Sequence, residues 1–279
     1  MVGERDLHHR WQMKRARLRD GTALWCDEPL GVGTVWAEIE SYFREGEGVR
    51  AGETVFDVGA NIGLFSLAAF RQSGGKAHIW SFEPIPATCA IASANARRFD
   101  PEEHHWHCVR AGLGERDEIA VLNHFPRLSV LSGRFRGGEQ ARREMDEFLA
   151  QERVGAPFEF ANRFPVAVRR ATGRALGTLL LRTRPVAAQI WTLSSALRKL
   201  KVERVDWLKV DVEGGELDVL RGVEAADWAR IGRVVCEIES VVILDEAVTL
   251  LERAGFAVEV RDNEIMQGQE LKIVFARRV

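Results

Sequence analysis

The chain has 279 residues, 46% of them hydrophobic, so it can bury a core and does not belong to the disordered class. Its 39 basic and 41 acidic residues give a formal net charge of −2, which argues against a general nucleic-acid binder. Four scattered cysteines without a CxxC pair, no signal-peptide stretch at the start and no apolar run long enough to cross a bilayer argue against secreted and membrane proteins and favour a cytoplasmic one.

Short apolar runs alternate with helical patterns through most of the chain. This alternation predicts an α/β fold with a doubly wound, mostly parallel sheet, and two closing strands predict a hairpin that adds an antiparallel strand. In chain order, the predicted strands are 54–58, 77–82, 106–111, 119–124, 205–210, 233–238, 257–261 and 271–276, and the predicted helices are 64–71, 86–99, 215–221 and 244–254.

The first part of the chain departs from this alternation. Residues 1–50 begin with basic residues and then show a strand pattern near 23–25 and a helical pattern near 34–43. We therefore expect them to form an N-terminal extension or cap.

A second departure is the long interruption between the strands at 119–124 and 205–210. It is too long for a simple loop, and residues 138–152 have a helical pattern. Residues 134–184 carry 11 arginines and 6 acidic residues, a local charge of +5. We expect a lid-like insertion at about 130–188.

A glycine-containing loop, Asp57-Val58-Gly59-Ala60-Asn61-Ile62-Gly63, directly follows the strand at 54–58. Glycines allow a tight turn, so that backbone N–H groups and the start of the next helix can face a ligand. Glu83 follows 20 residues after Gly63, at the end of the next strand, where a carboxylate holds ribose hydroxyls in doubly wound sheets. The loop and the acid together predict a nucleoside site, although a tight turn with a solvated glutamate stays open.

The same loop distinguishes between two nucleoside cofactors. A G-x-G-x-x-G motif starting at Gly59 would need glycines where the chain has Asn61 and Leu64, which compromises a close approach to a pyrophosphate. The carboxylate of Asp57 would also repel a pyrophosphate, whereas it suits an ammonium group. The sequence therefore favours S-adenosylmethionine over NAD.

Further carboxylates end the next two strands. Asp211 and Glu213 follow the strand at 205–210 at the edge where ligands bind in such sheets, and acids there are costly without a partner. Glu216 lies in the first turn of the next helix, where capping explains it as well as catalysis does. Glu237 and Glu239 end the following strand, and a base, a substrate contact or a salt bridge to arginine all stay open.

Four histidines need separate consideration. His104, His105 and His107 lie close together, but no further ligand accompanies them, so we expect no metal site. His124 lies just before the long interruption, where it could face an acceptor and act as a base.

Read together, three blocks resemble the FkbM family of S-adenosylmethionine-dependent methyltransferases. The blocks are TVFDVGANIGLFSL (54–67), SFEPIP (81–86) and DWLKVDVEGGELDVLRG (206–222). PRLSVLSGRF (126–135) and IWTLSSALRKLKVERVDWLKVD (190–211) are similar to the members of that family associated with polyketide and peptide assembly lines. The resemblance implies a Rossmann-like, seven-stranded sheet of the class I methyltransferase type over residues 51–279, with an inserted helical lid.

The resemblance also implies roles for individual residues. Asp57, Gly59, Asn61 and Gly63 are expected at the methionine end of the cofactor, Glu83 at its ribose, and Ala111 and Leu113 beside its adenine. Ala60, Pro84 and Asp211 are expected in the same site. The general base is expected among Glu213, Glu239 and His124, and assembly-line relatives tend to have a histidine where this chain has Glu239.

The implied reaction is methylation of a hydroxyl oxygen on a small-molecule natural product of polyketide or glycosyl type. Two alternatives stay open. One is C- or N-methylation of an anionic acceptor, phosphorylated or tethered to a carrier, attracted by the arginines of the insertion. The other is a non-catalytic nucleoside-binding protein. We expect neither nucleic acid nor a membrane as a partner, and an oligomer stays open.

Overall fold

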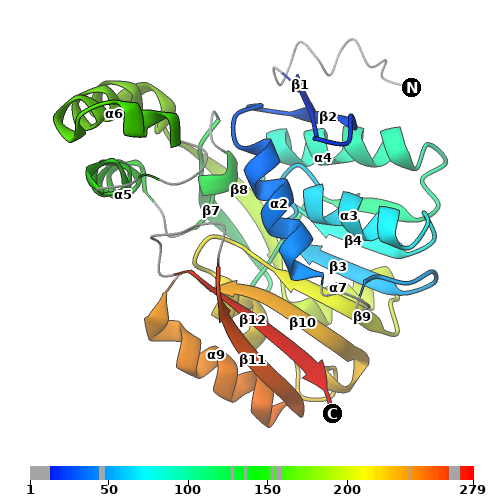
Figure 1. The fold of residues 1–279 in the computed structure, drawn as a ribbon. Coiled ribbons are helices and arrows are strands. Elements are labelled where there is room, and N and C mark those ends of the chain that lie inside the picture. Colours follow the sequence, from blue (N-terminus) through cyan, green and yellow to red (C-terminus); the bar gives the residue numbers. More distant parts are fainter. Residues whose placement is uncertain are drawn as a thin grey trace.

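The computed structural model describes residues 13–43, 48–126, 129–134, 137–151, 154, 159–238, 240–263 and 271–279. Its centre is a seven-stranded sheet in the order β11-β12-β10-β9-β3-β4-β5 (Figure 1). Strand β12 runs antiparallel to β10 and β11, and the pairs among β10, β9, β3, β4 and β5 are parallel. The predicted fold class is therefore confirmed, including the closing hairpin. The strands are β3 (Thr54–Val58), β4 (His78–Phe82), β5 (Trp106–Val109), β9 (Val205–Val210), β10 (Ile231–Ile238), β11 (Phe256–Asp262) and β12 (Lys272–Arg278).

Helices cover both faces of this sheet (Figure 1). Alternate residues of a strand face opposite sides, and the two cores divide accordingly: Val55 and Trp207 pack in one, Phe56 and Leu208 in the other. The first core contains α2 (Val32–Tyr42), α3 (Leu64–Gln72) and α4 (Pro86–Phe99). The second contains α7 (Leu193–Leu200), α8 (Glu216–Arg221) and α9 (Val241–Arg253).

The N-terminal segment is packed onto the first core. Strand β1 (Lys14–Arg17), which the sequence did not predict, pairs antiparallel with β2 (Ala23–Cys26). The side chain of Asn95 on α4 bonds both backbone groups of Trp25, at 2.7 and 2.9 Å. Because β2 and α2 share the core with the main sheet, α2 has a fixed position beside the carboxyl ends of the strands.

A second, three-stranded sheet corrects the prediction for residues 106–191. Strand β7 (Glu118–His124) does not join the main sheet; it pairs antiparallel with β8 (Arg184–Trp191), which was not predicted. Strand β6 (Gly112–Leu113) pairs parallel with β8. Between β7 and β8 lie α5 (Gly138–Ala150) and the unpredicted α6 (Val166–Leu180), which pack on each other beside the sheet (Figure 1).

Three short 3₁₀ helices complete the described structure: η1 (Ser129–Leu131), η2 (Glu159–Arg163) and η3 (Trp228–Arg230). Within the described residues, no helix combines the length and the apolar character needed to cross a membrane.

Candidate active site

A cavity of about 740 Å³ lies at the carboxyl ends of β3, β4, β9 and β10. Three parts of the chain surround it: the loops that follow these strands, helix α2, and the segment from η1 to α5. Ligands bind at this edge in open α/β sheets. Of the sequence-predicted site residues, those that line the cavity are Gly59, Ala60, Asn61, Glu83, Pro84, Leu113, Asp211 and Glu213.

The glycine loop passes very close to the end of β9. Gly59 has a φ of 78°, and a Cβ added there would lie 1.7 Å from the carbonyl oxygen of Asp211, so the position admits only glycine. The N–H groups of Gly59 and Ala60 donate to the carbonyl oxygen of Phe82, at 3.1 and 3.0 Å. These two amides therefore hold the loop against β4, in contrast to the expectation that they face a ligand.

Gly63 begins α3 and does not line the cavity. Its φ is 86°, and a Cβ there would approach the ring of Trp106 to 2.9 Å. A glycine is therefore required at position 63 for the close packing of α3 on the sheet.

Asp57, which the sequence predicts at the methionine end of the cofactor, lies beneath the loop. Its side chain is completely buried and does not line the cavity. One carboxylate oxygen accepts from the N–H and the hydroxyl of Ser66 on α3, at 3.2 and 2.6 Å, and the other lies 3.4 Å from the ammonium of Lys209. Asp57 faces the α3 side of the sheet, as Val55 does, so it supports the loop from below.

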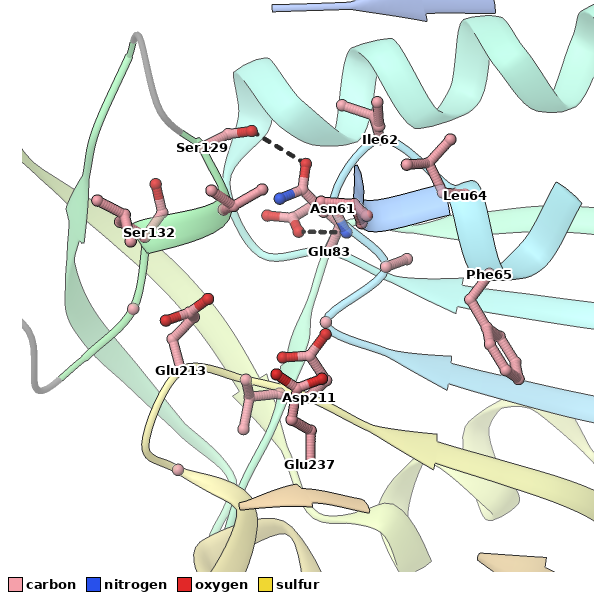
Figure 2. A pocket seen from close by; sticks show the side chains of 18 of the residues that line it. Asn61, Ile62, Leu64, Phe65, Glu83, Ser129, Ser132, Asp211, Glu213 and Glu237 are labelled. Carbon is pink, nitrogen blue, oxygen red and sulfur yellow. Dashed lines mark hydrogen bonds between the residues drawn. The ribbon is translucent and has the colours of Figure 1, made fainter. Parts of the chain in front are cut away.

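Glu83 has its carboxylate at the cavity and bridges two loops. Its oxygens accept from the N–H of Asn61 at 3.0 Å and from that of Ile85 at 2.8 Å. Burial raises the pKa of Glu83 to about 8, although these two hydrogen bonds oppose the shift. The side chain of Asn61 in turn accepts from the hydroxyl of Ser129, which connects the glycine loop to η1 (Figure 2).

The residues expected beside an adenine are only partly at the cavity. Leu113 lines it, together with Gly112 and Gly114, whereas Ala111 is completely buried and does not. A Cβ at Gly112 would lie 2.9 Å from Ile190, so β8 closes this end of the cavity.

Lys209 is a buried cation at the base of the cavity, and the sequence reasoning missed it. Its ammonium donates to the carbonyl oxygen of Gly59 at 3.0 Å and lies 3.1 Å from a carboxylate oxygen of Asp211. Burial lowers the pKa of Lys209, but Asp211 and Asp57 outweigh that effect and raise it overall. The signal was a lysine inside the apolar run VDWLKV, which needs a buried partner.

The loop after β9 presents Glu213 to the cavity. Glu213 and Gly214 have φ values of 59° and 94°, so the chain reverses direction there. The buried carboxylate of Glu216 accepts from the N–H groups of Val212 at 3.2 Å and Gly214 at 2.9 Å. Glu216 therefore shapes this loop, in agreement with the structural interpretation of its role.

Two more carboxyls reach the cavity beside Asp211. Glu38 comes from α2 and Glu237 from β10, and we call Glu38, Asp211 and Glu237 the acidic floor. The Tyr42 hydroxyl donates to Glu237, and the Asn263 amide donates to Glu38. The pKa of Glu237 is raised strongly, mainly by burial and secondly by the nearby charge of Asp211. The pKa of Glu38 rises to about 7 for the same reasons, against the Asn263 hydrogen bond.

Glu38 and Tyr42 were not predicted as site residues, because they lie on α2 and reach the site only where α2 packs near β10, which is far away in the sequence. The available signal was a glutamate and a tyrosine four residues apart on the predicted helix near 34–43, which places both on one face.

His124, another base candidate, is not brought to the cavity. His124 is almost completely buried and is not among the lining residues; its ring Nδ1 lies 3.3 Å from the Ser132 hydroxyl, and burial lowers its pKa. Glu239 lies outside the described residues. Among the described residues, no three histidine, cysteine, aspartate or glutamate side chains are grouped to hold a metal ion.

Helix α5 contributes apolar side chains to the lining of the cavity, beside the acidic Glu147. The apolar ones are Ala141, Met145 and Phe148, and we call these three the apolar wall. The neighbouring arginines have partners elsewhere: Arg170 and Arg174 both bond the carboxylate of Asp146.

Other arginines of the insertion are also engaged within the protein. Arg169 donates to Asn162 and to the Gln151 carbonyl. Among the described arginines of 134–184, only Arg134 lines the cavity, and its guanidinium bonds Glu118 at 2.7 Å. The described arginines of the insertion are therefore not concentrated at the cavity.

Comparison with known proteins agrees with this geometry. Residues 57–258 match the family model of the methyltransferase FkbM domain. The chain is 33% identical over 238 residues to the 31-O-demethyl-FK506 methyltransferase FkbM of Streptomyces tacrolimicus, covering 85% of each chain. It is 32% identical over 211 residues to methyltransferase 1 of Beauveria bassiana, covering 74% of this chain and 73% of that protein.

A solved structure supports the fold. The crystal structure of methyltransferase FkbM from Methylobacillus flagellatus KT superposes with a TM-score of 0.51 at 15% identity, over 85% of this chain. The chain spans about half of that protein, 47% of its length. The family match covers well over half of the chain, and with it the glycine loop, Glu83 and the loop after β9. The chain therefore belongs to the FkbM family of S-adenosylmethionine-dependent methyltransferases.

Proposed function

We propose that the chain transfers a methyl group from S-adenosylmethionine to a hydroxyl oxygen of an apolar small-molecule natural product of polyketide type. The observation that carries the proposal is that one cavity is lined both by the acidic floor and by the apolar wall. The relative from Streptomyces tacrolimicus, by its name a 31-O-demethyl-FK506 methyltransferase, supports methylation of a hydroxyl oxygen.

The acidic side of the cavity fits the cofactor. The three carboxyls of the floor and the buried Asp57 surround one ammonium group, that of Lys209, so this region favours a cationic ligand. The sulfonium and ammonium groups of S-adenosylmethionine are such cations. Glu83 presents a carboxylate for the ribose hydroxyls, and Leu113 with Gly112 borders the place for the adenine. When bound, the cofactor supplies an activated methyl group.

The apolar wall favours a neutral acceptor over an anionic one. A phosphorylated or carrier-tethered acceptor would need cations that point into the cavity. Arg170 and Arg174 instead bond Asp146, and Arg134 bonds Glu118. Met145 and Phe148 offer the acceptor an apolar contact surface.

Catalysis then consists largely of positioning. Holding the acceptor oxygen in line with the methyl carbon and the sulfur supplies much of the acceleration, because the donor is already activated. A positioned base removes the hydroxyl proton and adds a factor of about 10²–10⁴.

The test uses 31-O-demethyl-FK506 and a panel of neutral polyketides with free hydroxyls. We expect S-adenosylmethionine to bind in a calorimeter, S-adenosylhomocysteine to form with at least one of these acceptors, and mass spectrometry to place the methyl group on oxygen. Methylation of a phosphorylated or carrier-tethered acceptor alone would favour the anionic alternative. Cofactor binding without turnover of any acceptor would favour a non-catalytic binding protein.

Two variants separate the apolar wall from the arginines. Phe148→Ser removes apolar surface from the wall, and we expect the acceptor KM to rise about tenfold, as a loss of about 1.4 kcal/mol of contact energy requires. Arg143→Gln removes an exposed arginine from the same helix, and we expect it to leave KM unchanged. The opposite pattern would contradict a neutral acceptor.

A further inference from the structure

Glu38 and Glu237 bring two carboxyls to one cavity from parts of the chain that are far apart in sequence. Glu38 lies on α2, upstream of the matched family domain, and Glu237 lies near the end of β10. Both line the cavity. Each is held by one polar side chain: Tyr42 donates to Oε2 of Glu237, and Asn263 donates to Oε1 of Glu38. Their orientation is therefore set before any ligand arrives.

The surroundings of the pair contain more acids than cations. Asp211 faces it from β9, Tyr42 faces it from α2, and Lys209 contributes one positive charge. The contacts of Lys209 at 3.1 and 3.4 Å are to Asp211 and Asp57, not to the pair. Full ionisation of both glutamates would leave close like charges in a desolvated place, which is costly. At neutral pH the pair therefore retains a proton, with a pKa of about 7 for Glu38.

The other acids at the cavity are committed to other partners. Burial also raises the pKa of Glu83, to about 8, but both of its oxygens accept from backbone N–H groups, at 2.8 and 3.0 Å, so they have less capacity left for an acceptor hydroxyl. The carboxylate of Asp211 is paired with Lys209. Glu213 lies on the loop after β9 and is drawn apart from Glu237 in Figure 2. The pair thus combines access to the cavity with an ability to hold a proton near neutral pH.

We propose that Glu38 and Glu237 together are the proton acceptor for methyl transfer, with Tyr42 and Asn263 as their positioning residues. This proposal rests on the proposed O-methylation. The acceptor oxygen forms a bond to the methyl carbon while the carbon–sulfur bond breaks and its electron pair stays on sulfur. The hydroxyl proton passes to the singly ionised pair, which becomes neutral and later releases the proton to solvent.

Glu38→Gln and Glu237→Gln test the pair directly, since each keeps the shape and removes the proton-accepting carboxylate. With 31-O-demethyl-FK506 or the panel acceptor that is methylated, we expect kcat to fall about 10²–10⁴-fold in each variant. We expect the dissociation constant of S-adenosylmethionine, from calorimetry, to change far less than kcat does, because Asp211 remains at the acidic floor in each variant. The matched control is Glu40→Gln, an exposed glutamate on the same helix as Glu38 that does not line the cavity and should retain wild-type kcat.

Tyr42→Phe separates positioning from a purely structural role. The Tyr42 hydrogen bond lowers the pKa of Glu237, so its loss should raise that pKa. Because Glu38 carries the lower step of the pair, the change should appear in the upper step: in a titration of the glutamate carboxyls, the step of Glu237 should move to higher pH. A merely structural tyrosine would lower stability and leave this step in place.

A titration that needs no acceptor supplies an independent readout. In protein labelled with ¹³C at the glutamate carboxyl carbons, the pair should titrate in two coupled steps, the lower near neutral pH, and Glu38→Gln should move the step of Glu237 downward. Titration of both groups near the ordinary glutamate value of about 4.3 would overturn the proposal.

The remaining outcomes are distinguishable. Wild-type kcat in both glutamine variants would show that Glu38 and Glu237 are not the proton acceptor, and it would not affect the proposed function. A parallel loss of cofactor affinity would show that the pair holds the cationic cofactor instead of accepting the proton. Cofactor binding without turnover of any acceptor by the wild type would refute the proposed function and the pair with it.

Discussion

A carboxylate oxygen of Asp57 lies 3.4 Å from the ammonium group of Lys209, and both side chains are buried beneath the glycine loop. Lys209 also donates to the carbonyl oxygen of Gly59, and Asp57 accepts from Ser66 at the start of α3. The pair therefore ties β3, β9 and α3 together at the place where the loop begins. A residue that sequence reasoning placed against the cofactor is in fact part of the support under the loop.

Replacing Lys209 with methionine should destabilise the protein strongly. The change leaves the buried carboxylate of Asp57 without its cation, and breaking a buried ion pair from one side costs about 3–5 kcal/mol. Urea unfolding measures this loss. Lys14→Met breaks an exposed pair with Glu28 and should cost no more than about 1 kcal/mol. Similar losses in the two variants would mean that the buried pair does not stabilise the loop.

The close approach of the glycine loop to β9 predicts a large effect of a single methyl group. Gly59→Ala places a Cβ against the Asp211 carbonyl oxygen and should cost roughly 4 kcal/mol or more. Gly52→Ala has a similar φ of 80° but meets nothing within 4 Å, so it should cost only about 1–2 kcal/mol of backbone strain. The difference between the two unfolding free energies isolates the steric contribution. Equal losses would show that the loop can shift.

Stability should depend on pH through Glu38. Burial raises its pKa to about 7, above the value of about 4.3 in an unfolded chain. Between these two values the folded protein binds more protons than the unfolded chain does. The free energy of unfolding contributed by Glu38 should therefore fall as pH rises from about 4.5 to 7, by up to about 1.4 kcal/mol per unit.

Urea unfolding across this pH range checks the sign and the source of the effect. Glu38→Gln should reduce the slope, and Glu83 and Glu237, whose pKa values are also raised, should keep the rest of it. Glu40→Gln, an exposed glutamate on the same helix, should leave it unchanged. An unchanged slope in the Glu38 variant would assign it to other carboxyls.

The contact between α5 and α6 should weaken when Asp146 becomes asparagine. Arg170 and Arg174 both bond this carboxylate, and they hold its pKa well below the ordinary value. The pair of helices is exposed, so the effect should appear as faster amide hydrogen exchange in α5, more so at low salt than at high salt. Glu147→Gln, an exposed change on the same helix, is the control. Unchanged exchange in Asp146→Asn would show that apolar packing alone holds α5.

The strand–helix alternation could be predicted because it depends on local patterns. β3 and α4 have the predicted bounds, since apolar runs and the proline at the start of α4 are signals within a few residues. The seven-stranded sheet follows from this alternation together with the family resemblance.

The elements and residues that the sequence did not predict depend on contacts between distant parts of the chain. Strand β8 pairs with β7, which lies about sixty residues earlier in the chain. Helix α6 bonds Asp146 on α5 through Arg170. Asp57 was assigned to the cofactor because it adjoins the glycine loop, but strand alternation turns it toward α3. Glu38 and Tyr42 reach the cavity only because the N-terminal segment folds onto β10. No short-range pattern reports such an approach.

The pairing of His124 with Arg184 places the two ends of the helical insertion side by side on adjacent strands. The chain leaves the three-stranded sheet and returns to it at the same point. Because the entropic cost of closing a loop grows only slowly with its length, helices between these two residues can be exchanged, lengthened or shortened without changing the strands that close it. The helices of the insertion can thus diverge as a replaceable module, while the seven-stranded sheet keeps its architecture.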